Sequence, residues 1–145
     1  MPNTRLLVQV ATMCELALIE KDNVLSAIRM IDTLYVASQP NINLGPDETL
    51  GVRVTLLISL KSGDVVGDRE IRIVLRRPTG TTTEIHRSTL NFGGGEHGQN
   101  LRIFTVMETT EPGLFWFDVM EAENVLTSIP FKLIHGRPDQ RPSTL

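Results

Sequence analysis

The sequence predicts an all-β protein: an antiparallel two-sheet β-sandwich, immunoglobulin-like, with seven to nine short strands. Three observations predict this class. Apolar and polar residues alternate along several segments, and clusters of Gly, Pro, Asn and Asp separate those segments. Val, Ile and Thr together number 38 against only 5 Ala, and stiff β-branched side chains favour strands over long helices.

Length and composition limit the chain to one domain, which we place at residues 1–135, followed by a flexible tail at 136–145. The single cysteine, Cys14, excludes an internal disulfide framework, and no exit signal is recognisable, so we expect a cytoplasmic protein. No apolar run approaches the roughly 20 residues of a membrane span. A net charge of −3 offers no basic field for a nucleic-acid backbone.

The first third of the chain gives the weakest pattern. Residues 5–13 alternate imperfectly and predict a strand, while residues 14–21 fit either a short helical turn or a short strand. Residues 24–36 are apolar on both faces, which predicts a strand that bends midway and serves both sheets. Asp32 within that strand needs a partner if it is buried, and we expect Arg29 or a turn N–H. Residues 39–48 predict a loop.

The centre of the chain shows the clearest alternation. Every even position of residues 50–60 is apolar, which predicts a strand over 50–61 with one buried and one wet face. Residues 69–77 repeat the rule. Turn residues at 62–64 and 67–68 are expected to separate these two strands.

The last strands follow the same period of two. Residues 81–90 predict a Thr-rich strand near an edge, and residues 100–107 are apolar on both faces, which predicts deep burial or a bulge. Residues 114–121 and 125–135 predict a hairpin with its turn at 121–124. Pro130 lacks an N–H, so the final strand is expected at an edge or bulged there.

Three segments together carry a family resemblance. These are the Cys-Glu-x-Ala-Leu-Ile-Glu segment beginning at Cys14, the Pro-Gly-Leu-Phe-Trp-Phe segment beginning at Pro112, and the Ser-Ile-Pro-Phe segment beginning at Ser128. Across residues 5–135 the chain resembles a family of small uncharacterised bacterial and phage proteins with an immunoglobulin-like β-sandwich. The resemblance implies that fold, and it implies no activity and no catalytic residues. Leu114-Phe115 stands where such hairpins often have Tyr.

A candidate protein-binding surface follows from the alternation around Trp116. If Phe115, Phe117 and Val119 face the core, the residues between them face outward, and a large indole flanked by apolar side chains is a plausible partner anchor. The alternative is that a loop or the tail covers Trp116. The predicted protein-binding set is Leu114, Trp116 and Met120 with a rim of Arg53, Arg72 and Arg76.

A second candidate site is the glycine-rich segment at residues 91–99, which contains Glu96 and His97. It lacks the Lys and Ser or Thr of a nucleotide loop, and a flexible connection between strands is the simpler interpretation. His86, His97 and His135 have no metal-ligand spacing, and Cys14 next to a carboxylate is more typical of a small buried residue than of a nucleophile.

These observations favour a non-enzymatic β-sandwich that acts through protein–protein binding or self-assembly, possible partners being another protein or a second copy. We expect no cofactor, no metal, no nucleic acid, no membrane contact and no small-molecule ligand. The alternative is a small enzyme or ligand-binding protein whose site lies in loops at one end, around Glu96, His97 and Asp47.

Overall fold

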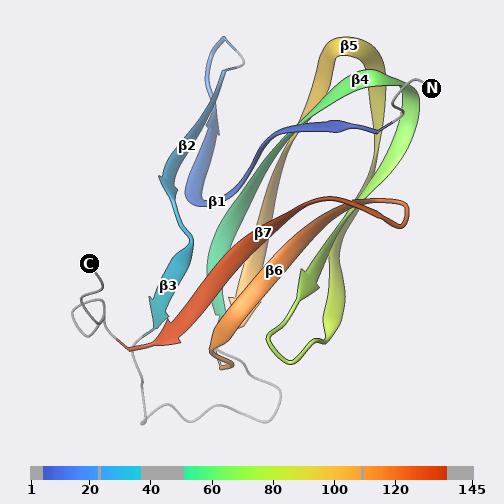
Figure 1. The fold of residues 1–145 in the computed structure, drawn as a ribbon. Helices are drawn as coiled ribbons and strands as arrows, with labels where there is room; N and C mark the ends of the chain where they lie inside the picture. Colours follow the sequence, from blue (N-terminus) through green and yellow to red (C-terminus); the bar gives the residue numbers. More distant parts are fainter. Residues whose placement is uncertain (1–4, 23, 37–50, 109, 137–145) are drawn as a thin grey trace, which may run out of the picture.

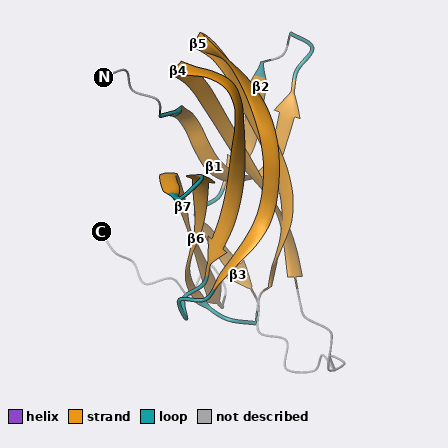
Figure 2. Ribbon diagram, turned by 90° about the vertical axis from the view of Figure 1, so that its right-hand side faces the viewer, coloured by secondary structure: helices purple, strands orange, loops and turns teal. Residues whose placement is uncertain are grey.

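Strands dominate the computed structural model, which describes residues 5–22, 24–36, 51–108 and 110–136. All segments with regular structure are strands, which confirms the all-β prediction, and Figures 1 and 2 show their arrangement. None of the described segments is a helix that could span a membrane. The strands are β1 (Leu7–Ile19), β2 (Leu25–Met30), β3 (Thr33–Val36), β4 (Gly51–Arg76), β5 (Thr82–Glu108), β6 (Gly113–Glu121) and β7 (Asn124–His135).

The strands form one continuous hydrogen-bonded sheet rather than two separate ones. Its order is β2-β1-β4-β6-β7-β3, and β5 pairs with β4 beside that path. Every pair is antiparallel except β3 and β7, which run parallel. The predicted pair of wholly antiparallel sheets is therefore replaced by a single mixed sheet.

Two unusually long strands explain this continuity. β4 has 26 residues and β5 has 27, and they pair along almost their whole length while bending together, as the upper part of Figure 1 shows. The prediction that turns at 62–64 and 67–68 separate two strands is wrong, because β4 continues through both segments. Gly63 and Gly67 do adopt positive φ angles of 57° and 108°, but the register shifts around them bend β4 instead of ending it.

The glycine-rich segment expected to be a loop belongs to β5. Gly95 lies opposite Gly63, and Gly93 lies opposite Val66, so glycines bend both strands at the same place. A Cβ atom on Gly98 would lie 2.1 Å from the carbonyl oxygen of Leu60, so the two backbones approach closely there. The glycines thus permit a bend in a paired strand, not a flexible connection.

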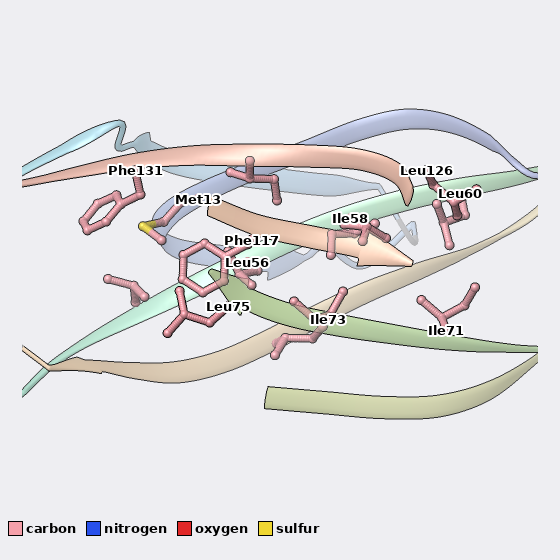
Figure 3. Packing of buried hydrophobic residues seen from close by; sticks show 14 of the residues in the cluster. Met13, Leu56, Ile58, Leu60, Ile71, Ile73, Leu75, Phe117, Leu126 and Phe131 are labelled. Atoms are coloured by element: carbon pink, nitrogen blue, oxygen red, sulfur yellow. The ribbon is translucent and has the colours of Figure 1, made fainter. Parts of the chain in front are cut away.

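The bend reverses which residues of β4 face the core. Before it, even-numbered residues such as Leu56 and Ile58 are buried, and after it, odd-numbered residues such as Ile73 and Leu75 are buried. The first half of β4 pairs with β1 and the second half with β6. Both halves contribute to one apolar cluster, in which Figure 3 shows their side chains pointing toward one another around Phe117.

The face of residues 51–61 that carries the odd-numbered side chains is less exposed to solvent than predicted. Thr55, Leu57 and Ser59 are buried, and Leu57 packs with Cys14 and Ala17 of β1 in a second, smaller cluster. The Ser59 hydroxyl donates a 2.7 Å hydrogen bond to Asn100 Oδ1, which satisfies it there. The wet face therefore begins only near the Gly51 end of β4.

The N-terminal third resolves in favour of strands. Residues 14–19 continue β1, so the helical turn considered for 14–21 is wrong. Residues 24–36 split into β2, which pairs with β1, and β3, which pairs with β7, so the predicted bend is confirmed. The two pieces lie at opposite edges of one sheet, so the predicted role in two sheets is wrong. Asp32 at the bend is exposed and accepts a 3.1 Å hydrogen bond from Thr33 Oγ1. Arg29 pairs instead with Glu15, at 3.1 Å.

The C-terminal hairpin matches the prediction closely. β6 and β7 are joined by a two-residue turn in which Ala122 has a φ of 51°. Pro130 lies opposite Trp116, and β3 pairs with β7 only from Lys132, so among the described strands β7 has one unpaired edge at Pro130. The predicted loop at 39–48 and tail residues 137–145 lie outside the described residues.

Candidate functional site

The outward side of β6 carries Leu114, Trp116 and Met120, the residues predicted to bind a partner. Phe115, Phe117 and Val119 are buried, while Leu114 is 43% exposed and Trp116 is half-buried, so the predicted alternation is confirmed. We call this surface, formed by Arg72, Arg76, Leu114, Trp116, Asp118 and Met120, the tryptophan face.

Arg76 ties the tryptophan face together. Its Nε lies 3.2 Å from Asp118 Oδ2 and its Nη2 lies 3.1 Å from Asp118 Oδ1, a two-point contact. The same guanidinium lies over the Trp116 ring, 5.4 Å from the ring centroid. Arg76 is therefore held by Asp118 of the same surface, and its guanidinium covers one side of the Trp116 indole.

Asp118 is nearly buried, and its environment favours the charged form. Burial alone raises the pKa of this carboxyl. Hydrogen bonds from Arg76 and from Ser128 Oγ, at 2.6 Å, together with the Arg76 charge, outweigh burial and hold the pKa of Asp118 below its usual value. The carboxylate is thus a fixed, ionised acceptor at neutral pH.

Arg72 is also occupied. Its Nη2 donates a 2.8 Å hydrogen bond to the Ala122 carbonyl and lies 3.9 Å from Met120 Sδ, while its Nη1 lies 3.5 Å from Glu84 Oε1. Glu84 in turn accepts from Arg87 at 2.7 Å. The predicted arginine rim is therefore a network of pairs across β4, β5 and β6.

Arg53 is not part of this surface. It lies in the first half of β4, opposite Val106 of β5, and with Phe104, Thr105 and Val106 it lines a shallow hollow of about 450 Å³. The structure thus brings together five of the six predicted binding residues and places Arg53 elsewhere.

The neighbours of Arg53 form an apolar surface that the sequence pattern did not identify. Phe104 is 57% exposed and Val106 is 62% exposed, so the deep burial predicted for residues 100–107 is wrong on their outward side. Ile103 and Met107, on the other side, are buried as expected. We call the outward set Arg53, Arg102, Phe104, Val106 and Glu108 the β5 edge surface.

The strand that carries this surface is an edge strand. Within the described parts of the chain, β5 pairs with β4 and with no other strand, although it is 27 residues long. The edge strand predicted at 81–90 is thus part of a much longer one. Unpaired backbone N–H and C=O groups along such an edge can pair with another chain. A signal for this surface exists in the sequence: the charged residues Arg102 and Glu108 stand on the same face as Phe104 and Val106 and flank them.

The residues of the alternative site are not brought together as a metal centre. Glu96 and His97 are exposed on β5, and His86 Nε2 lies 3.1 Å from Ser88 Oγ farther along the same strand. Among the side chains that the structure describes, no three His, Cys, Asp or Glu gather as potential metal ligands. Asp47 lies outside the described residues.

Cys14 is fully buried and is not in a disulfide. Burial raises the pKa of the Cys14 thiol, although a hydrogen bond from the Leu16 backbone acts in the opposite direction. A raised pKa decreases the thiolate fraction at neutral pH, which is the opposite of what a nucleophile needs.

Comparison with known proteins informs the fold only. No family model and no curated protein matches the sequence. Among solved structures, the chain is similar to Pseudomonas fluorescens alkylpurine DNA glycosylase AlkC bound to DNA containing an abasic site analog, with a TM-score of 0.53 and 14% identity over 90% of this chain and 31% of that one. It is also similar to the β-glucosidase from Listeria innocua, with a TM-score of 0.52 and 13% identity over 89% of this chain and 16% of that one. The chain therefore spans about a third and a sixth of these proteins.

Proposed function

We propose that this protein acts by binding another protein chain, and that the β5 edge surface is its binding surface. The observation that carries the proposal is the coincidence of two features on one strand. The edge of β5 is unpaired in the described structure, and Phe104 and Val106 on it are more than half exposed.

Each feature supports binding for a separate physical reason. An unpaired strand edge offers backbone hydrogen bonds to an added strand, which give affinity. Exposed aromatic and β-branched side chains on the same strand supply apolar area that an added strand would cover. Long apolar edges are normally blunted in proteins that remain single, so an open one points to a partner.

The tryptophan face is the second candidate for protein binding. Leu114 is exposed, but Arg72 and Arg76 already use their donors on groups of this chain. The tryptophan face thus offers a partner mainly charged groups that are already paired, whereas Phe104 and Val106 offer two apolar side chains that are more than half exposed. We therefore assign the primary contact to β5.

We propose that the bent sheet corresponds to an immunoglobulin-like sandwich whose two layers share β4 and β5. The supporting observation is the single apolar cluster to which both halves of β4 contribute. A cytoplasmic location is in keeping with the free thiol of Cys14.

An enzymatic or DNA-binding role is not proposed from the structural neighbours. The glycosylase and the glucosidase carry out their functions as much longer chains, and the likeness is below 15% identity. The net charge of −3 also disfavours a phosphate backbone as partner.

Site-specific photo-crosslinking tests the proposed surface. A photoreactive phenylalanine analogue is placed at Phe104, at Trp116 or, as a matched exposed control, at Val66, which is 73% exposed. After irradiation in cell extract, mass spectrometry identifies the attached chains. We expect a discrete protein adduct from position 104 and none from position 66. Adducts from position 116 alone would move the binding function to the tryptophan face and overturn this assignment.

A further inference from the structure

We propose that the partner of the β5 edge surface is a second copy of this chain, paired antiparallel, β5 to β5, about a two-fold axis at Thr105. This inference rests on the proposed function, because it names the occupant of the same surface. It predicts a dimer whose sheet continues from one copy into the other.

The sequence of β5 is self-complementary about Thr105. In an antiparallel pair centred there, residues equally distant on either side of Thr105 lie opposite one another. Phe104 then faces Val106 of the second copy, and Arg102 faces Glu108 of the second copy. Every outward contact between residues 102 and 108 is thus either apolar with apolar or positive with negative.

The two central pairs bury the exposed apolar side chains together. The two-fold axis generates each pair twice, so two Phe104 and two Val106 side chains form one strip across the junction. Aromatic and β-branched cross-strand pairs are favourable combinations on a sheet. Arg53, opposite Val106 on β4, lies beside each end of this strip.

The two pairs of Arg102 with Glu108 of the other copy flank the apolar strip, one on each side. Glu108 is exposed, and no ion pair to Glu108 occurs among the described residues. Arg102 donates one hydrogen bond from Nη1 to the Ala17 carbonyl, at 3.1 Å, and lies 5.7 Å from the centroid of the Phe104 ring. That contact directs the guanidinium toward β1, so pairing requires the Arg102 side chain to turn toward the junction, where its five N–H donors can reach Glu108 of the second copy.

Neighbouring registers lack this complementarity. A two-fold axis perpendicular to the sheet pairs outward side chains with outward side chains, so the axis must pass through a residue. The neighbouring registers are therefore centred on Phe104 or on Val106. Centred on Phe104, the pairing sets Arg102 against Val106. Centred on Val106, it sets Phe104 against Glu108. Both place a charge opposite an apolar side chain, so Thr105 is the favoured centre.

Two variants of this chain with reversed charges at positions 102 and 108, tested alone and mixed, test the proposal. R102E places Glu against Glu108 twice in a homodimer, and E108R places Arg against Arg102 twice. We expect each variant alone to dimerise at least about tenfold more weakly than wild type in analytical ultracentrifugation. An equimolar mixture restores opposite charges at both pairs, so we expect a heterodimer, resolved by mass in native mass spectrometry. E96R is the matched control and should dimerise like wild type.

Rescue by mixing separates the pairing from any local effect of R102E. The mixture does not restore the bond from residue 102 to Ala17, so recovery of the dimer can come only from contact between copies. If R102E does not fold, oxidation of T105C supplies the second measurement. Directly opposite Cα atoms in an antiparallel pair lie about 4.5–5.5 Å apart, within disulfide range, whereas V106C atoms would lie about 7 Å or more apart. We expect a disulfide dimer from T105C and not from V106C.

The outcomes distinguish this inference from the function on which it rests. A wild-type chain that stays monomeric at high concentration, or single variants that dimerise as wild type does, would overturn the β5–β5 pairing. If the crosslinker at position 104 still captures a different protein, the proposed function stands and only the identity of the partner is wrong. A monomer with no adduct from position 104 would remove both.

Discussion

Arg76 of β4 reaches diagonally across the β4–β6 pair to Asp118 and binds both of its carboxylate oxygens. The Asp118 side chain is only 11% exposed, whereas that of Arg76 is 43% exposed. The pair therefore joins a nearly buried anion to a cation that solvent still reaches, and this asymmetry decides what each substitution does.

Replacing Arg76 by alanine should destabilise the fold and change the surroundings of Trp116. The substitution leaves Asp118 nearly buried with only Ser128 as a hydrogen-bonding side chain, and it uncovers the indole. We expect a loss of about 1–2 kcal/mol in the free energy of unfolding, at the low end for such a pair because water screens Arg76. Urea unfolding followed by Trp116 fluorescence measures both effects, since the chain has one Trp. A variant with wild-type stability and emission would contradict the described contact.

Asp118 should make stability depend on acid pH. Its pKa is lower in the folded chain than its ordinary value of 3.8, so the folded state binds a proton less readily than the unfolded state. The resulting stabilisation is fully present above that ordinary value and is lost as the pH falls through the folded pKa. Urea titrations between neutral pH and about pH 3 should show a decline that is shallower in D118N. An equally steep decline in D118N would assign the acid sensitivity to other carboxyl groups.

Two glycines of β5 should respond differently to alanine. A Cβ on Gly98 would lie 2.1 Å from the Leu60 carbonyl oxygen, whereas one on Gly93 would meet only His97 side-chain atoms, at 3.5 Å or more. We expect G98A to destabilise by about 1–3 kcal/mol through overpacking and G93A to have little effect. Thermal unfolding of both variants checks this. Equal effects would show that the two strands are not closely paired at Leu60.

The thiol of Cys14 should be unreactive in the native chain. It is fully buried, and burial raises its pKa, so both access and the thiolate fraction are decreased. Labelling with an aromatic disulfide reagent, followed by absorbance, should be slow in buffer and rapid in urea. The C14S variant has no thiol and gives the background absorbance, and the native protein in buffer should stay close to that background. Rapid labelling of the native chain would place Cys14 in an accessible environment.

Local pattern was sufficient to predict most strands of this fold. Alternation at Leu56, Ile58, Ile73 and Leu75 identified the core side of each half of β4 correctly. The same pattern could not show that the two halves are one strand. Gly63 with a positive φ fits a reversal and a bend equally well, and only the partner strand, with Gly95 opposite Gly63, selects the bend.

The candidate surface was predicted less completely. Trp116 and its neighbours were placed on the outward side from alternation alone. The bonds of Arg76 to Asp118 depend on the register between β4 and β6, which one sequence does not reveal. The exposure of Phe104 was missed because a run apolar on both faces is typical of a central strand, and only topology shows that β5 has a neighbour on one side.

The uninterrupted backbone of β4 has a mechanical consequence. Layers joined only by loops can slide or swing apart while each stays intact. Here any separation of the halves must straighten the curve at Gly63 and Gly67 or rupture the ladder to β5. The two halves should therefore move together under shear. The amide protons on either side of the curve should exchange with solvent in a single cooperative opening.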